Sequence, residues 1–416
     1  MTIQNFYNQL KNEFIFSDSK IFSKLRLDIL DNFEITPKIK KNNESLKYLD
    51  LRVLDFEYKY KYLFKDITYS DHDEEKILIS VIDGKVSNVN KRIKDNNGLN
   101  IRNIDNANRI AEDTFLNFQN YFDNDYVLDL NSLMLNSGYE IIIGKNQELT
   151  IFISNTVSEE ELTLFQKNII NCSEGSKIII IEECIFDKKS NTNIANYINL
   201  EEGSNITHLI FQNNHAKANL QFTSFANCKS NSKYKQIILD ISKGSIRNHH
   251  YANLIGERAC VELDGIFFAS KNQIIDNKTR VNHNFPNCRS SQRYKGILTD
   301  QSRASYLSKT FVDSIAQKTE AYQLSKGILL SDESYFHSKP ELKIYADDVK
   351  CSHGSTIGPI DRDLLFYLRS RGLSKKQSTS FLIKSFFHDI ISDIHNKSFV
   401  EKFNYHSNIW LKENNI

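Results

Sequence analysis

Short runs rich in β-branched and aromatic residues recur through the middle of this chain, and their spacing is the feature that most restricts its fold. Six of these runs begin between 26 and 33 residues apart. They are LTIFIS, KIIIIEE, ITHLIFQ, YKQIILD, CVELDGIFF and RYKGILTD. This distance is the length of a whole supersecondary unit, whereas a β-sandwich places a turn about every 8–12 residues. The period therefore favours a parallel β-solenoid, in which strands pair with their equivalents one turn earlier and later, over a β-sandwich.

Gly-Ser steps separate several of these runs. They occur at 175–176, 203–204 and 244–245, and an isoleucine follows each within two residues. Glycine adopts turn conformations that other residues avoid. We therefore expect all three steps to mark one corner of the solenoid, revisited on successive turns.

The segment after residue 358 changes to helical patterns. Asp361 is a suitable N-cap for RDLLFYLRSR, and Gly372 is a suitable C-terminal stop. Ser374 and Gln377 have the spacing of a capping box that opens a second helix. Apolar residues recur along that helix at helical spacing, at Phe381, Leu382, Phe386, Ile390 and Ile394. We expect a hairpin of two short helices.

The first part of the chain mixes helical and irregular patterns. One stretch places apolar residues on a single helix face, at Phe22, Leu25, Ile29 and Phe33.

Together, these patterns predict a mainly β protein with a right-handed parallel β-helix core over residues 129–358. An N-terminal mixed and helical region, residues 1–128, and a C-terminal helical region, residues 359–416, would flank this core.

Composition argues against several classes of protein. Lys and Arg number 53 against 52 Asp and Glu, which leaves no basic excess for nucleic acid phosphates. The six cysteines include no C-x-x-C pair, so we expect neither a structural zinc site nor a thioredoxin-type site. No apolar run approaches the roughly 20 residues that span a bilayer, and the start MTIQNFYNQLKNEF has no signal-peptide core. We expect a bacterial cytoplasmic protein, or a stromal one if an organelle encodes it, that binds neither nucleic acid nor membrane.

Five motifs in the second half of the chain are specific enough to compare with known families. They are D-x-x-T-x-x-x-H, S-x-Q-x-Y-K-G, A-Q-K-T-x-A-Y-Q, K-P-x-L-x-I-x-A-D-D-V-x-C-S-H-G and L-F-Y-L-x-S-R-G. In these motifs the chain resembles the SufB/SufD family, whose members are paired components of a sulfur-mobilising iron–sulfur cluster assembly machine. The resemblance is good over about residues 195–395 and faint before them.

Within the family, the KCSHGS and FYLRSRG runs resemble the SufD branch. Leu368 stands where the SufB branch has a cysteine. The cysteine that SufB proteins use to receive sulfur also has no counterpart here, because Ser308, Lys309, Ala316 and Gln317 occupy that neighbourhood. The resemblance therefore implies a subunit other than the sulfur acceptor.

The resemblance also implies partners and cargo. The chain would pair with a SufB-like protein through the β-solenoid and bind a SufC-like ABC ATPase through its C-terminal helices. The resemblance implies a subunit that is no enzyme. The G-x-x-x-x-G-K-[ST] pattern of a phosphate-binding loop is absent, so ATP hydrolysis would come from a partner. It would hold no cofactor stably, and a transient iron–sulfur cluster or iron would sit at the interface with the SufB-like protein. A homodimer in isolation is left open.

The C-S-H-G motif supplies the candidate metal site. The resemblance assigns His353 to the nascent cluster site, and a neutral imidazole suits iron; the alternative is a histidine hydrogen-bonded in a turn. Cys351 is a weaker candidate, because a thiol at a strand end is often a small buried apolar group. If this segment is extended, both side chains point to one face. For Asp347 and Asp348 we expect a structural role, capping a turn or pairing with Lys350.

Other histidines have less specific interpretations. His249 and His250 would face opposite sides of a strand, so we expect surface or dimer contacts and no metal pair. His283 with Asp276 is expected to pack or to form an Asp–His hydrogen bond, since no nucleophile accompanies them.

Two short helices cannot bury all the aromatic residues of the C-terminal region, and an exposed aromatic patch is typical of an interface. We expect a partner-binding surface formed by Leu365, Phe366, Tyr367, Arg371, Phe386, Phe387 and Ile390.

Two other functions stay open. One is a purely structural β-solenoid scaffold without a cluster-site residue. The other is a carbohydrate-active β-helix enzyme, which needs clustered carboxylates with Ca²⁺ and a basic residue along one groove. The runs show few carboxylates at matching positions, which disfavours that enzyme.

Overall fold

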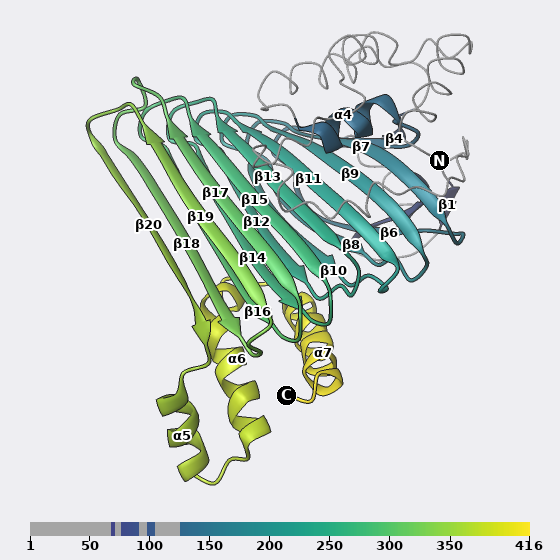
Figure 1. Cartoon of the computed structure of the whole chain (residues 1–416). Helices are drawn as coiled ribbons and strands as arrows, with labels where there is room; N and C mark the ends of the chain where they lie inside the picture. The colour runs from purple at the N-terminus through teal and green to yellow at the C-terminus, as the bar shows by residue number, and fades with distance from the viewer. Residues whose placement is uncertain (1–67, 71–75, 91–97, 105–124) are drawn as a thin grey trace.

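The computed structural model describes residues 68–70, 76–90, 98–104 and 125–416. Strands dominate these residues, and most of the helices follow them in the sequence (Figure 1). The predicted helix that contains Phe22 lies outside the described residues and stays a prediction, as does the extent of the N-terminal region.

The strands form two sheets. The first has 11 strands in the order β1-β3-β2-β6-β8-β10-β12-β14-β16-β18-β20. Their bounds are β1 Thr68–Ser70, β2 Ile77–Ile82, β3 Lys85–Asn90, β6 Glu148–Thr156, β8 Lys177–Cys184, β10 Asn205–Gln212, β12 Lys233–Asp240, β14 Cys260–Ala269, β16 Arg289–Leu298, β18 Thr319–Leu329 and β20 Val349–Pro359. The second has nine strands in the order β19-β17-β15-β13-β11-β9-β7-β5-β4. Their bounds are β4 Leu99–Asn103, β5 Tyr139–Ile143, β7 Leu162–Cys172, β9 Ser190–Leu200, β11 Ala218–Cys228, β13 Ile246–Leu254, β15 Ile274–His283, β17 Arg303–Val312 and β19 Tyr335–Ile344.

From β6 onward the chain alternates between the two sheets, one strand in each per turn. Neighbours within each stack are parallel and in register, as where Lys177 lies opposite Asn205 and Asn205 opposite Lys233. Figure 1 shows the resulting coil of stacked turns. The predicted parallel β-solenoid is confirmed, and the β-sandwich alternative is wrong.

All six predicted runs belong to the 11-stranded sheet, and the sequence analysis missed most strands of the other sheet. Those strands carry polar side chains on their inward face, which interrupt the apolar alternation. Asn196 donates to Glu182, and Ser224 donates to Gln236, from strands of the opposite sheet. Both asparagine and serine are buried, so the solenoid has a partly polar interior.

A ladder of asparagines marks the missed strands. From the second member on, each Nδ2 group donates to the Oδ1 atom of the asparagine one turn earlier, over distances from 2.7 to 3.5 Å. The ladder consists of Asn171, Asn199, Asn227, Asn253 and Asn282. A fixed residue type recurring once per turn is the signal that would have located these strands.

The Gly-Ser steps lie at two different corners, so the prediction of one corner is wrong. Gly175 and Gly203 precede β8 and β10 with φ values of 71° and 67°, in the left-handed region that favours glycine. Gly244 precedes β13, at the opposite corner. A Cβ atom there would lie 1.8 Å from the carbonyl oxygen of Ala218, so close backbone approach explains this glycine.

The two ends of the solenoid differ. At the N-terminal end, β2 pairs antiparallel with β3, and β4 pairs antiparallel with β5. At the C-terminal end, β19 pairs with β17 alone and β20 with β18 alone, among the strands that the structure describes. The last turn therefore presents two free strand edges, which we call the open end (β19 and β20).

Four helices are described. α4, Tyr126–Leu133, packs on the 9-stranded sheet, where Asn131 bonds Asn193. α5, Arg362–Ser370, begins at the predicted N-cap, and α6, Lys375–Ile391, begins with the predicted capping box. α7, Lys397–Glu413, follows, and the sequence analysis did not single it out. α6 and α7 cover the outer face of the 11-stranded sheet through one shared apolar core. No helix among the described ranges is long and apolar enough to cross a membrane.

Candidate functional site at the open end of the solenoid

Cys351 and His353 lie on β20, the last strand of the solenoid. The alternative of a histidine in a turn before a helix is therefore wrong, because the strand continues to Pro359 and α5 begins only at Arg362. The chain is extended at both residues, so their side chains share one face of the strand.

That shared face is the inward one. Cys351 pairs with Ala321 and His353 with Gln323 on β18, and both partners are buried inside the solenoid. No further described turn covers β20, so the ring of His353 is exposed while facing the interior side. At the open end, side chains on the inward face of β20 are therefore accessible to solvent.

The two candidate ligands have different surroundings. Cys351 is partly buried and packs on a small apolar cluster of Val312, Ala316 and Ala346. Burial raises the pKa of the Cys351 thiol, against a smaller opposing effect of a backbone hydrogen bond from Ala321. The thiol is therefore protonated at neutral pH in the isolated chain, and His353 is the more accessible ligand.

The wall beneath His353 is held by a chain of hydrogen bonds. Gln323 is 4% exposed; its Nε2 atom donates to Thr310 Oγ1 at 2.8 Å, and its Oε1 atom accepts from Ser308 at 3.2 Å. One turn deeper, Gln292 donates to the same Thr310 oxygen at 2.8 Å. Gln292, Gln323 and His353 occupy the same register, so the histidine ends a fixed polar column.

The open end can supply part of a metal site. The described residues contain no group of three or more His, Cys, Asp or Glu side chains that could hold a metal. Cys351 and His353 stand on alternate residues of one strand, roughly 7 Å apart at their Cα atoms. Thiolate and imidazole are both ligands of iron–sulfur clusters, so this pair supplies two of the ligand types that such a site takes.

The aspartates of the motif do not make the contacts expected of them. Lys350 pairs with Glu320 at 3.7 Å, so the expected pairing of Lys350 with Asp347 or Asp348 is wrong. Asp348 holds the turn through its backbone, with its N–H donating to Gln317 Oε1 at 2.9 Å. Both aspartates are exposed beside β20.

His249 and His250 are both buried, so the expected surface or dimer contact is wrong, although they do face opposite sides. His249 Nε2 lies 3.0 Å from the Asp276 carboxylate, on the side of α4. His250 Nδ1 lies 2.8 Å from Ser224 Oγ, inside the solenoid. Burial holds the pKa of His250 well below its usual value. Packing between the sheet and α4 accounts for the burial of His249. Packing inside the solenoid accounts for the burial of His250.

His283 is also buried, with Nε2 2.8 Å from Ser290 Oγ, and burial lowers its pKa to about 3. The expected Asp–His bond therefore exists with His249 as the partner of Asp276, while His283 bonds a serine. Each of these histidines has a structural role.

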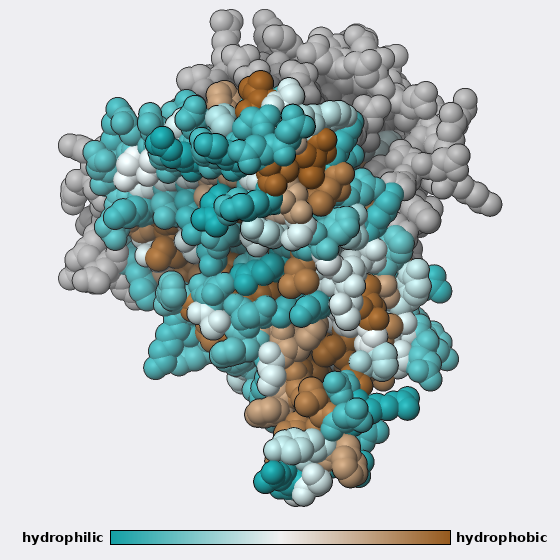
Figure 2. Space-filling model, turned by 90° about the vertical axis from the view of Figure 1, so that its left-hand side faces the viewer, coloured by the Kyte–Doolittle hydropathy of each residue, from teal (hydrophilic) through white to brown (hydrophobic). Residues whose placement is uncertain are grey.

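The C-terminal helices present a second candidate surface. α5 has no buried residue, and Phe366 is 73% exposed. We call α5 and α6 the arm, and its exposed apolar residues the arm surface, which consists of Leu364, Phe366, Tyr367 and Phe381. Figure 2 shows brown apolar atoms gathered at the lower, helical end of the molecule.

The residues of the predicted partner surface differ in exposure, and their role in binding a partner stays a prediction. Phe387 is 3% exposed and Ile390 is fully buried, so these two predictions are wrong; both pack on the 11-stranded sheet instead. Phe386 is partly buried beneath Lys295. Leu365 is partly buried, and Arg371 is exposed and lies over the ring of Tyr367. Leu364 and Phe381 are exposed but were not predicted as part of this surface, because helical spacing alone does not show which side the sheet covers.

Comparisons with known proteins agree with this geometry. A family model described as SUF system FeS cluster assembly, SufBD core domain, matches residues 152–386. The iron–sulfur cluster assembly protein SufD of Escherichia coli is 30% identical over 247 residues, 57% of this chain and 57% of that protein. A SufBD family protein of Synechocystis is 31% identical over 205 residues, 49% of this chain and 45% of that protein.

A chloroplastic protein of Arabidopsis thaliana is 29% identical over 231 residues, 54% of this chain and 48% of that protein. The chain thus spans about half the length of the curated relatives it matches.

Proposed function

This chain belongs to the SufBD core domain family of iron–sulfur cluster assembly proteins, and from that premise we propose that it is a SufD-like subunit of a Suf assembly complex. Its role would be to pair with a SufB-like protein and a SufC-like ATPase, with no turnover of its own. The observation that carries the proposal is the position of Cys351 and His353 on the inward face of a last turn that no other described strand covers.

The open end would be the surface for the SufB-like partner. Free edges of β19 and β20 offer backbone donors and acceptors to a second sheet, and proteins rarely leave such edges uncovered. Partly buried apolar residues of the last turn, including Ile344 and Ile357, would lose their remaining solvent contact there. A second solenoid docked end to end satisfies both needs.

Pairing would also complete the site for the cargo. His353 and, after deprotonation of its thiol, Cys351 would each offer one ligand to iron or to a nascent cluster. The partner would supply the other ligands. The cluster is cargo and is passed on, so neither residue would hold a permanent metal.

The arm surface would bind the SufC-like ATPase. Three aromatic residues, Phe366, Tyr367 and Phe381, are more than half exposed, and Arg371 lies beside them. Clustered aromatic residues with an arginine are typical of protein interfaces. The bacterial cytoplasm, or the stroma of an organelle, is the proposed location.

The test is co-expression with SufB-like and SufC-like partners, followed by anaerobic purification and measurement of iron and acid-labile sulfide. His353→Ala is compared with wild type, and Ser355→Ala, an exposed residue on the same face, is the control. We expect the complex to assemble in all three cases, with iron and sulfide falling only in His353→Ala.

Two results would contradict parts of the proposal. Unchanged iron and sulfide in an assembled His353→Ala complex would make the chain a scaffold without a cluster-site residue. Failure of wild type to assemble with either partner would remove the proposed subunit role itself.

A further inference from the structure

We propose that a group of ion pairs at the C-terminal end of α6 fixes the direction of the arm relative to the solenoid and transmits force between them. We call this group the arm anchor, and it consists of Arg293 and Lys295 on β16 with Asp389 and Asp393 at the helix end. Only the last step of the proposal, the coupling to an ATPase, rests on the proposed function.

The arm touches the solenoid over a short length. The buried apolar residues of α6 are Ile383, at the middle of the helix, and Phe387 and Ile390, in its C-terminal half. Phe387 packs against Phe268 of β14 with ring centroids 5.3 Å apart. Apolar contacts of this kind are not directional, so they hold α6 against the sheet without fixing its angle. Figure 1 shows α5 and the start of α6 projecting away from the sheets.

Lys295 supplies the first directional contact. Its Nζ atom donates to the backbone carbonyl of Phe386 at 2.7 Å and to the Asp389 carboxylate at 2.5 Å. The lysine side chain is only 6% exposed. Burial works to raise the pKa of Asp389, but the hydrogen bond and charge of Lys295 outweigh it and hold that pKa below its usual value. The Lys295 ammonium group thus binds both a backbone carbonyl and a side chain of the same helical turn.

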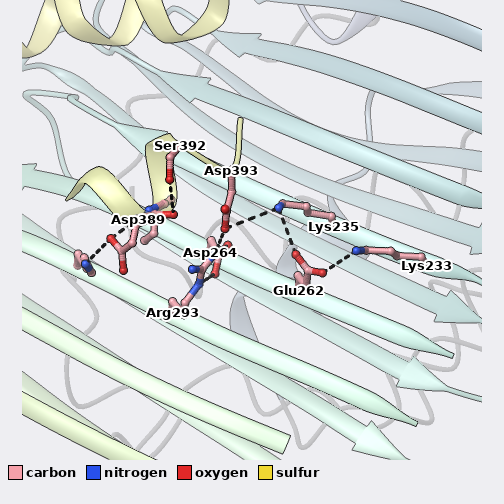
Figure 3. A network of polar contacts seen from close by, with 10 residues as sticks. Lys233, Lys235, Glu262, Asp264, Arg293, Asp389, Ser392 and Asp393 are labelled. Atoms are coloured by element: carbon pink, nitrogen blue, oxygen red, sulfur yellow. Dashed lines mark hydrogen bonds and ion pairs between the residues drawn. The ribbon is translucent and has the colours of Figure 1, made fainter. Parts of the chain in front are cut away.

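Arg293 supplies the second directional contact between α6 and the solenoid. Its guanidinium makes two bonds to the fully buried Asp264 of β14, at 2.9 and 2.6 Å, and a third to Asp393 at 2.7 Å. The hydrogen bond from Arg293 to Asp264 is the main cause of the raised pKa of the arginine. Figure 3 shows Asp393 between Arg293 and Lys235. Lys235 also pairs with Glu262. The end of α6 is therefore tied to β12, β14 and β16.

The two contacts lie four residues apart, with Asp389 in the last turn of α6 and Asp393 just past its C-cap, Ser392. Cations there also meet the negative end of the helix dipole. Because Asp389 and Asp393 are paired with cations of β16, the last part of α6 can neither rotate nor slide on the apolar face of the sheet without breaking charged hydrogen bonds. α6 runs unbroken from Lys375 to Ile391, so a fixed end gives a fixed direction to the arm surface. A pull on the arm surface would then reach β16, two turns from β20, and β14, three turns from it.

Spin-label distances test the anchor in the full chain alone. One label is placed at Lys376 on the arm and one at Asn272 in an exposed turn, in a background with Cys260→Ser and Cys351→Ser. We expect a narrow distance distribution for this background and a broad one after Lys295→Met. Asp393→Asn, a milder variant with a more exposed side chain, should also broaden it.

Lys402→Met is the matched control, because Lys402 ties α7, not the arm, to Glu183 of β8 at 2.5 Å. The Lys402→Met substitution should leave the distribution of spin-label distances narrow. Each lost charged contact is expected to raise the population of displaced arm about tenfold. A distribution that stays narrow in both anchor variants, or that broadens equally in Lys402→Met, overturns the proposal.

The coupling is tested in the complex. We expect Asp393→Asn to capture the SufC-like ATPase as wild type does, while ATP-dependent accumulation of iron and sulfide falls. Unchanged accumulation overturns the force-transmitting part of the proposal. If wild type captures no ATPase, the proposed function fails, whereas a broadened distance distribution in the isolated variant still supports the anchor.

Discussion

Burial decides what the histidines of this chain do. His208, His250 and His283 lie inside the solenoid, and each bonds a side chain there. His353 occupies an equivalent inward position, but the last turn leaves it exposed. The same residue type is therefore structural in the middle of the solenoid and available to a ligand at its end.

The interior histidines should make the fold sensitive to acid. The pKa of His283 is lowered to about 3, against an ordinary value near 6.5 in the unfolded chain. Between these pH values the unfolded chain binds the additional proton, so the free energy of unfolding falls as the pH falls. The loss is about 1.4 kcal/mol per pH unit from this residue alone, and it is absent above about pH 6.5.

His283→Gln should flatten that dependence, because glutamine keeps a donor for Ser290 and does not titrate in this range. The apparent melting temperature is measured from pH 8 to pH 4 for wild type, His283→Gln and the exposed control His395→Gln. We expect the wild-type and His283→Gln curves to converge toward low pH and the control to track wild type. Parallel curves for all three would show that His283 does not titrate across this transition.

At the scale of elements, α6 is divided between a buried part and an exposed part. Its C-terminal half is part of the core that it shares with α7 and the outer face of the 11-stranded sheet, and its N-terminal half carries Phe381 into solvent. The 3.6-residue period identified the apolar residues but could not divide them between core and partner surface. That division depends on Ile266, Phe268 and Ile297, whose outward direction the sequence does not reveal.

Two phenylalanines distinguish the buried part from the exposed part experimentally. Phe387→Ala should destabilise the fold by about 3–5 kcal/mol, the usual cost of removing a buried phenylalanine, because its ring contacts Phe268 and Phe403. Phe366→Ala should change the free energy of unfolding by less than about 0.5 kcal/mol, as exposed sites do, and should weaken capture of the SufC-like ATPase.

Urea unfolding followed by circular dichroism measures the first effect, and a pull-down measures the second. Loss of stability in Phe366→Ala, or none in Phe387→Ala, would mean that the arm is packed differently from this structure.

For the whole molecule, the period of about 28 residues was enough to predict a solenoid, because one strand per turn kept a clean apolar pattern. The other strand of each turn was hidden by inward polar residues such as Asn196, which bonds Glu182 of the opposite sheet, and His250, which bonds Ser224 one turn earlier. The candidate ligands could be predicted from the C-S-H-G motif. Their direction could not, since it depends on the register of β20 with β18 and on the absence of a further turn among the described strands.

The open end also predicts how the whole molecule associates. Ser355 is exposed on the inward face of β20, two residues from His353, and pairs with the buried Ser325. Ser355→Lys would place a charge where the proposed second solenoid would dock, and inward-pointing charges are a known means of blocking edge pairing. An unpaired charge buried in an interface costs about 2–5 kcal/mol, so capture of the SufB-like partner should weaken at least tenfold.

Ser352→Lys is the control, because Ser352 is exposed on the outward face of the same strand. Sedimentation velocity of the isolated chain should show concentration-dependent association for wild type and Ser352→Lys, and monomers for Ser355→Lys. Pull-downs with the SufB-like partner should rank the three proteins in the same way. If Ser352→Lys impairs capture and Ser355→Lys does not, the partner binds the outer face of the sheet, and His353 would lie outside the interface that its proposed role requires.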